Sequence, residues 1–244
     1  MNTRHVLIDA GNTRLKWVFV VDGQWQDHGN SDYGDLSALA SVLSVGMKCT
    51  IASVTRVDHE HQLKTLLARY AIEPRWLVAA PQYKDVINTY VNPAQLGVDR
   101  WMGMLAARLR SRSATLVVSA GTALTVDALS AEGHFLGGLI IPGRGLMQQS
   151  LQQGTAQIGA TLGDCQPFPR STADAVHSGI IAALCGAVRQ QYAQLARQCG
   201  CEPCCVLTGG DALLLQPYLG LTAEHAPYLV LEGIDRVVRE DVAG

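Results

Sequence analysis

Residues that could bind a phosphorylated ligand follow the first strand-like run of the chain. The run His5–Ile8 ends at Asp9 and breaks at Gly11, and a second apolar run, Leu15–Val21, follows at once. This pattern predicts a strand, a tight turn and a second strand that pairs back on the first. The Asp9 carboxylate could hold a hydrated magnesium ion, Gly11 lets the backbone approach a ligand closely, and the polar groups of the turn could donate to phosphate oxygens. An ordinary hairpin turn is the alternative, because Asp, Asn and Gly are common turn residues.

A similar arrangement occurs again in the second half of the chain. The apolar run 114–118 ends in Ser119-Ala120-Gly121-Thr122, and another apolar run follows. A third apolar run stops at Thr208-Gly209-Gly210. Two phosphate turns together with a Thr-Gly-Gly turn form a layout that resembles the acetate-and-sugar-kinase/actin type of ATPase.

An amphipathic helix is predicted directly after Gly97. Its apolar residues recur with the period of a helix and are Val98, Trp101, Met102, Leu105, Ala106 and Leu109. Asp99 and Arg100 fall in the first turn, where the helix dipole favours an ionised Asp99. A purely structural interpretation is also possible, in which Asp99 only complements the dipole and Arg100 is a surface charge.

Composition and charge narrow the class of protein. The chain has 244 residues, of which 48% are hydrophobic and 16% charged, as in a globular protein with a large core. The formal net charge of -2 gives no electrostatic reason to expect nucleic acid or an anionic membrane as a partner. No apolar run approaches the roughly 20 residues that span a bilayer, and no leader-like segment precedes the first strand. We therefore expect a cytoplasmic protein.

Cysteines gather near the end of a long predicted helix. Cys199, Cys201, Cys204 and Cys205 form this group, but their spacing is wrong for a usual zinc knuckle and no second ligand pair follows. Reduced structural thiols are the favoured interpretation, and zinc is the alternative.

The remaining elements follow from apolar runs and from residues that begin helices. Thr172 could cap a helix that runs from about residue 173 to residue 198. Residues 229–231 are predicted to form a last strand, and residues 234–242 a terminal helix. The short polar segment 110–113 separates the two halves of the chain, so we expect lobes of residues 1–113 and 114–244.

Taken together, the motifs resemble those of one family, the type III pantothenate kinases. They occur in the order of that family and cover nearly the whole chain. They are Asp9-Ala10-Gly11-Asn12-Thr13, Gly97-Val98-Asp99-Arg100, Ser119-Ala120-Gly121-Thr122-Ala123, Gly137-Gly138 with Pro142-Gly143, Thr172, and Thr208-Gly209-Gly210. Any one of these motifs is weak, but all six in order are specific.

The resemblance implies an α/β fold of two ribonuclease-H-like lobes, each a mixed sheet flanked by helices, with ATP in the cleft between them. It also implies an obligate homodimer, and a need for ATP, magnesium and a monovalent cation, potassium or ammonium. The implied ligands of the ATP phosphates are Asp9, Ala10, Gly11, Asn12, Thr13, Arg14, Leu15, Lys16 and Thr122, with Asp9 holding magnesium through water.

The same resemblance implies a substrate and a reaction. Pantothenate would be phosphorylated to 4'-phosphopantothenate, the first step of coenzyme A biosynthesis, with Asp99 as the catalytic base. The residues implied to contact pantothenate are Tyr90, Gly97, Val98, Asp99, Arg100 and Thr172.

The chain departs from the family at one position. The family usually has Asp at the first position of the second phosphate turn, where it helps to bind the monovalent cation, and this chain has Ser119. Two other functions remain open from the sequence: a nucleotide or polyphosphate phosphohydrolase of the same superfamily, and a non-catalytic nucleotide-binding regulatory protein.

Overall fold

The chain folds into two compact units. The computed structural model describes residues 3–155, 158–159, 161 and 163–243. The first unit contains the residues up to Arg110 together with those from Tyr228 onward, and the second unit contains Ser111–Pro227. The predicted lobes, residues 1–113 and 114–244, differ from these units mainly in the last helix, α7 (Leu229–Ala243). The buried side chains of Leu229, Leu231 and Ile234 explain this, because α7 packs on elements of the first unit.

A mixed sheet forms the centre of the first unit. Its strand order is β3-β2-β1-β4-β5, in which β1 pairs antiparallel with β2 and parallel with β4. The strands are β1 (Arg4–Ala10), β2 (Arg14–Val21), β3 (Gln24–Asp32), β4 (Lys48–Ser53) and β5 (Arg75–Trp76). The alternation of side chains along β1 supplies apolar groups to both faces, since Val6, Leu7 and Ile8 are all fully buried.

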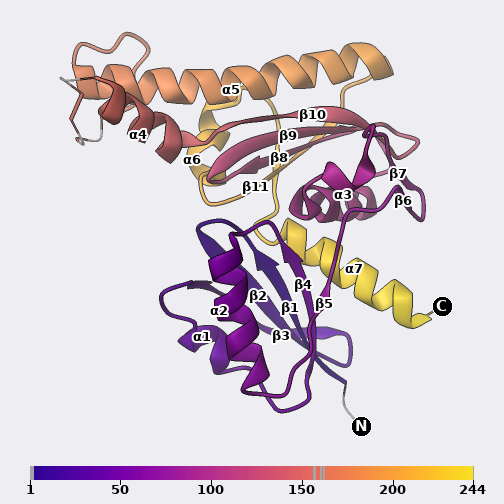
Figure 1. The fold of residues 1–244 in the computed structure, drawn as a ribbon. Helices are drawn as coiled ribbons and strands as arrows, with labels where there is room; N and C mark the ends of the chain where they lie inside the picture. Colours follow the sequence, from indigo (N-terminus) through magenta and orange to yellow (C-terminus); the bar gives the residue numbers. More distant parts are fainter. Residues whose placement is uncertain (1–2, 156–157, 160, 162, 244) are drawn as a thin grey trace. The chain divides into compact units, whose positions relative to one another are not determined.

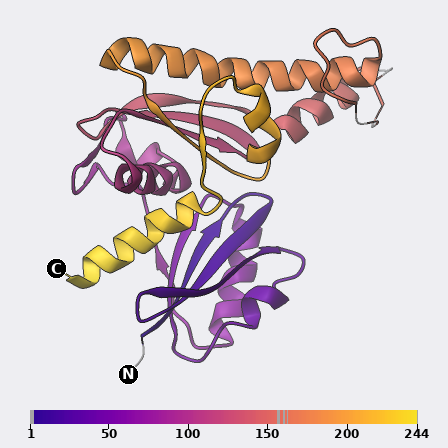
Figure 2. The same cartoon turned by 180° about the vertical axis from the view of Figure 1, so that it is seen from behind.

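Helices cover both faces of this sheet (Figure 1). Helix α2 (Val57–Ala68) buries Leu63, Leu66 and Leu67 in the same core cluster as Val6 and Ile8 of β1. Helix α7 lies along the other face, as the view from behind shows (Figure 2). The remaining elements of the unit are α1 (Ser37–Ala40), the hairpin of β6 (Gln82–Tyr83) and β7 (Val86–Asn88), the 3-10 helix Pro93–Gln95, and α3 (Val98–Arg110).

Close backbone contact and buried arginines hold α3 against α7. A side chain at Gly233 of α7 would collide with the backbone oxygen of Met102, so only glycine permits this approach. The buried Arg236 donates from Nη1 to the Leu105 carbonyl at 2.9 Å. Asp85 accepts from Arg236 at 3.3 Å and from Arg108 of α3 at 2.7 Å. The helix predicted at 98–109 is therefore confirmed, although every residue from Val98 to Arg108 except Asp99 is buried, rather than one side only.

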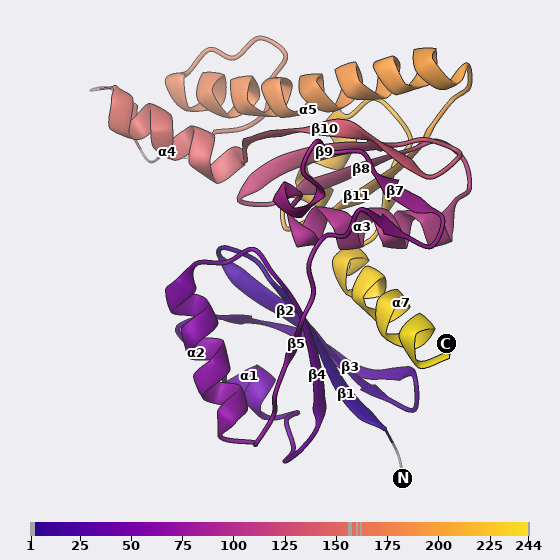
Figure 3. The ribbon, with the colours of Figure 1, turned by 45° about the vertical axis from the view of Figure 1, so that its right-hand side comes forward.

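The second unit also has a mixed sheet with helices packed on it (Figure 3). Within this unit the strand order is β12-β11-β8-β9-β10, with β8 antiparallel to β9 and parallel to β11. The strands are β8 (Thr115–Ala120), β9 (Ala123–Leu129), β10 (His134–Pro142), β11 (Cys204–Thr208) and β12 (Glu224–His225). The helices are α4 (Arg144–Gly154), α5 (Thr172–Cys199), α6 (Ala212–Leu215) and the 3-10 helix Gln216–Tyr218. The predicted α/β class, with helices flanking two mixed sheets, is confirmed.

Two local predictions are wrong. Ser171, not Thr172, is the N-cap of α5, since its side chain accepts a hydrogen bond from the Asp174 N–H. The strand predicted at 229–231 is instead the first turn of α7. Three apolar residues cannot distinguish a strand from a buried helix, and here the apolar spacing continues to Ile234 and Val237, as a helix requires. Within the described part of the chain, no helix is both long and apolar enough to cross a bilayer.

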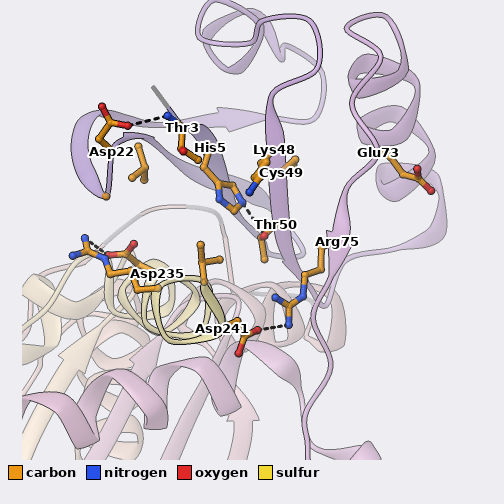
Figure 4. Close-up of a pocket in the computed structure, with 14 residues that line it drawn as sticks. Thr3, His5, Asp22, Lys48, Cys49, Thr50, Glu73, Arg75, Asp235 and Asp241 are labelled. Atoms are coloured by element: carbon orange, nitrogen blue, oxygen red, sulfur yellow. Dashed lines mark hydrogen bonds and ion pairs between the residues drawn. The ribbon is translucent and has the colours of Figure 1, made fainter. Parts of the chain in front are cut away.

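A cavity of about 590 Å³ lies within the first unit, where the N-terminal ends of β1 and β4 meet α7 (Figure 4). A histidine lies in its wall: His5 Nε2 is 2.9 Å from Thr50 Oγ1. Arg75 of β5 reaches across to Asp241 of α7, with a separation of 2.7 Å. Burial is the main cause that lowers the pKa of His5 to about 4, and the positive charge of Lys48 adds to it.

We predict that His5 lowers the stability of the folded protein in mild acid. Because the folded-state pKa of about 4 is below the unfolded value of about 6.5, the unfolded chain takes up the extra proton between these limits. The free energy of unfolding should therefore fall by about 1–3 kcal/mol from this group as the pH drops from 6.5 to 4. Thermal unfolding of His5→Asn across this range should show a smaller loss than the wild type.

The exposed His61 of α2 supplies the matched control. His61→Asn should retain the pH dependence of the wild type. If His5→Asn and the wild type lose stability equally between pH 6.5 and pH 4, His5 does not carry this effect.

Candidate active site

The first candidate phosphate turn joins β1 to β2, as the sequence predicted. Ala10, the last residue of β1, pairs with Leu15, and β2 begins at Arg14, so Gly11, Asn12 and Thr13 form the turn between the strands. A Cβ atom on Gly11 would lie 3.1 Å from the Arg14 carbonyl oxygen, which is tighter than an ordinary contact. Asn12 and Thr13 are exposed. The turn therefore presents polar groups on a backbone that is tightly folded at Gly11.

Asp9 lies at the base of this turn, opposite Lys16 in the β1–β2 register. Burial raises the pKa of Asp9 to about 7; the charge of Lys16 opposes this shift, and the charge of Asp99 adds to it. Burial also lowers the pKa of Lys16, against the charge of Asp9. A buried carboxylate with a raised pKa is a favourable oxygen ligand for a cation, because a nearby cation removes the penalty of ionisation.

Asp99 occupies the first turn of α3, next to Gly97. A Cβ atom on Gly97 would lie 2.7 Å from Asp99 Oδ1, so glycine makes room for the carboxylate. Asp99 Oδ1 accepts a hydrogen bond from the Arg100 N–H at 2.8 Å. The helix dipole was expected to favour the ionised form of Asp99, but burial outweighs the hydrogen bond and the charge of Arg100, and the pKa of Asp99 is raised.

Arg100 is buried, so it is not the surface charge that the structural interpretation assumed. Its Nη1 donates to the Tyr90 hydroxyl at 2.9 Å, and its guanidinium lies 5.7 Å from the centre of the Tyr90 ring. The first unit thus brings together Asp9, Lys16, Asp99, Arg100 and Tyr90 from four separate segments. Val98, the neighbour of Asp99, is buried in the core.

The second candidate phosphate turn joins β8 to β9 in the second unit. Ser119 pairs with Thr125, and the Gly121 N–H donates to the Ala123 carbonyl at 3.0 Å. Two distant glycines pack against this turn. A side chain on Gly143 would collide with the backbone of Gly121, and one on Gly209 with the backbone of Ala120. The glycine motifs at 142–143 and 208–210 therefore both pack against the turn between β8 and β9.

An ion pair beside this turn was missed by the sequence interpretation. The Asp211 N–H donates to the Ala120 carbonyl at 3.0 Å, and its carboxylate accepts from Arg144 Nε at 3.1 Å. Asp211 directly follows the Thr208-Gly209-Gly210 motif, so its place next to that motif could have marked it as a candidate site residue. Nothing in the sequence indicates that it pairs with Arg144. The Thr122 carbonyl accepts a hydrogen bond from the Gly143 N–H at 2.9 Å. Thr172 is exposed at the start of α5.

Metal binding by cysteine finds no support in the geometry. Among the residues that the structure describes, no group of three or more His, Cys, Asp or Glu side chains is arranged to hold a metal ion. Cys199 and Cys201 approach each other, with their sulfur atoms 3.3 Å apart, and both are free thiols.

Comparison with known proteins finds relatives that share one name. A sequence profile described as type III pantothenate kinase matches residues 5–194. A type III pantothenate kinase of Thiobacillus denitrificans is 56% identical over 239 residues, which cover 98% of each chain. One of Nitrosospira multiformis is 41% identical, over 98% of this chain and 93% of the relative.

The fold of this chain is also similar to that of solved structures. A Campylobacter jejuni protein, named as belonging to a Baf family of transcriptional activators, superposes with a TM-score of 0.64 at 19% identity, over 98% of this chain and 100% of the other. At this identity the likeness shows the fold alone. The profile match over most of the chain and the close relatives show that this chain belongs to the type III pantothenate kinase family.

Proposed function

We propose that this protein phosphorylates pantothenate with ATP, giving 4'-phosphopantothenate, the first intermediate of coenzyme A biosynthesis. The observation that carries the proposal is the pair of buried carboxylates, Asp9 and Asp99, which lie close enough in one unit for the charge of Asp99 to raise the pKa of Asp9. The carboxylate beside the phosphate turn can hold the metal ion, and the one at the helix start can orient the attacking hydroxyl, two roles that recur in phosphoryl transfer.

The segment Asp9–Lys16 and Thr122 bind the ATP phosphates in this proposal. Support comes from the exposed turn after Gly11 and from the ammonium group of Lys16, which lies near Asp9. The fit to magnesium rests on the chemistry of Asp9, a buried oxygen donor, and magnesium prefers oxygen ligands while keeping several waters. Magnesium bound with ATP supplies neutralisation of charge on the phosphates.

Asp99 receives the proton of the pantothenate hydroxyl. Its raised pKa makes it a stronger base than an ordinary aspartate, and Gly97 and the Arg100 N–H fix the direction of its carboxylate. The buried guanidinium of Arg100, oriented by Tyr90, binds the pantothenate carboxylate. Gly97, Val98 and Thr172 complete the pantothenate contacts by resemblance to the family.

We also propose the homodimer and the cytoplasmic location that the family resemblance implies. Apolar side chains on α4 support an interface: Leu146 and Leu151 are exposed, and no residue of this helix is buried. Light scattering of the purified protein would measure its molar mass and test the dimer directly.

A coupled assay of ADP release tests the proposed reaction and separates it from its rivals. Release that depends on pantothenate supports the kinase. Release of phosphate from ATP at the same rate without pantothenate would indicate a phosphohydrolase. ATP binding without turnover would indicate a nucleotide-binding regulator, and either result would contradict the proposal.

We predict that Asp9→Asn abolishes ADP release and stabilises the free protein. The folded-state pKa of about 7 exceeds the unfolded value, so ionisation of Asp9 lowers stability progressively as the pH rises from 4 to 7. Removing the carboxylate should therefore raise the free energy of unfolding at pH 8 by up to about 4 kcal/mol, and by less at pH 4.5. Thermal unfolding at both pH values, beside the activity assay, measures this.

The control for this variant is Asp58→Asn, which alters an exposed acid in the first turn of α2. Asp58→Asn should leave both ADP release and the free energy of unfolding unchanged. A folded Asp9→Asn protein with normal turnover would remove Asp9 from the mechanism.

We predict that Asp99→Asn lowers kcat by a factor of about 100 to 10,000, the usual contribution of a general base. The substitution keeps the shape of the side chain but removes the basic oxygen. The affinity for ADP, measured by calorimetry, should stay within twofold of the wild type. If ADP affinity is lost while turnover at saturating ATP is normal, Asp99 is a nucleotide ligand and not the base.

Ser119 is predicted to weaken activation by a monovalent cation, because a hydroxyl lacks the charge of the carboxylate that the family usually has. Half-maximal activation should need a high potassium or ammonium concentration, or the dependence should be slight. Ser119→Asp should lower the concentration needed. Saturation of the wild type at low potassium, with no gain in the variant, would contradict this role.

A further inference from the structure

The first phosphate turn is held from outside by a tyrosine distant in sequence. The Tyr33 hydroxyl donates to the Gly11 carbonyl, with an oxygen–oxygen distance of 2.7 Å. Tyr33 reaches the turn because β3 pairs with β2 as far as Arg14 and Asp32, and Tyr33 directly follows the end of β3. The side chain is buried in the same core cluster as Ala10 and Leu15.

This hydrogen bond fixes the direction of a peptide unit. In a planar trans peptide the C=O and N–H bonds point in opposite directions. The Gly11 carbonyl and the Asn12 N–H belong to one such unit, so a carbonyl held toward Tyr33 directs the Asn12 N–H away from the core. The preceding unit is held likewise, since the Val54 N–H donates to the Ala10 carbonyl at 3.1 Å.

Tyr33 is itself held in place. Its ring stacks on that of His59, with a centroid distance of 3.8 Å and an interplanar angle of 13°. His59 Nδ1 in turn lies 2.9 Å from Thr55 Oγ1. Burial is the main cause that raises the pKa of Tyr33 above its ordinary value, so the hydroxyl remains protonated and can donate at neutral pH.

We propose that Tyr33 is a positioning residue for nucleotide phosphates: by holding the Gly11 carbonyl, it aims the Asn12 N–H at the phosphate chain. The inference rests on the proposed function in taking this turn as the phosphate site. Tyr33 touches neither ATP nor pantothenate in this account, and acts only through the backbone of the turn.

Two ligands that differ only in their phosphates separate this role from general support of the fold. The affinities of adenosine and of ADP with magnesium would be measured by calorimetry or by ligand-observed NMR. We expect Tyr33→Phe to weaken ADP binding about three- to tenfold, the usual worth of one hydrogen bond, and to leave adenosine binding unchanged. Loss of the hydroxyl frees the peptide unit and removes no group that adenosine could contact.

Tyr70→Phe is the matched control, because Tyr70 also donates from its hydroxyl to a backbone carbonyl, that of Ala40, at 3.3 Å in the same unit. It should change neither affinity. Unchanged ADP binding in Tyr33→Phe, equal losses for ADP and adenosine, or the same ADP-selective loss in Tyr70→Phe would each overturn the proposal. The ratio of the two affinities stays informative even if a variant is less stable, since both ligands bind only folded protein.

A failure of the proposed function can be distinguished from a failure of the role proposed for Tyr33. If ADP release by the wild type does not depend on pantothenate, the substrate assignment fails, while the comparison of ADP with adenosine still reports on Tyr33.

Discussion

The buried carboxylate of Asp9 is the group on which the candidate site depends. Ionising a carboxylate in a protein interior is unfavourable, and Lys16 opposite it offsets only part of this penalty, because the pKa of Asp9 still rises to about 7. The nearby charge of Asp99 increases the penalty. The first unit therefore holds two acids whose ionised forms a cation would stabilise, which suits a site that receives phosphates together with magnesium.

Asp9 and Asp99 stay close together only if the elements that carry them are held rigidly. For α3, which carries Asp99, the packing of α7 does this. Gly233 lets α7 approach α3 to backbone contact, and Arg236 ties the two helices through the Leu105 carbonyl and Asp85. Asp99 lies in the first turn of the helix that is held in this way, so its carboxylate is positioned by a packed helix and not by a loop. The hairpin holds Asp9 through the register of β1 with β2.

Sequence reasoning predicted the parts of this site that local patterns encode. The first hairpin and its turn, the helix after Gly97 and the second turn at Ser119 all follow from short apolar runs broken by glycine. Features that depend on burial or on distant contacts were not predictable: the rise in the pKa of Asp99, the burial of Arg100, and the hydrogen bond from Tyr33 to a residue 22 positions away. Helix α7 was predicted only in part, because a three-residue apolar run does not distinguish a strand from a buried helix.

The most direct test of this account is the pKa of Asp9 itself, measured by NMR titration of its carboxyl carbon in the free protein and again with magnesium and ADP. We expect a value of about 7 in the free protein and a clear fall when magnesium and ADP are bound, because a cation stabilises the ionised form. A value in the free protein close to the ordinary aspartate pKa, or one that magnesium and ADP leave unchanged, would contradict it.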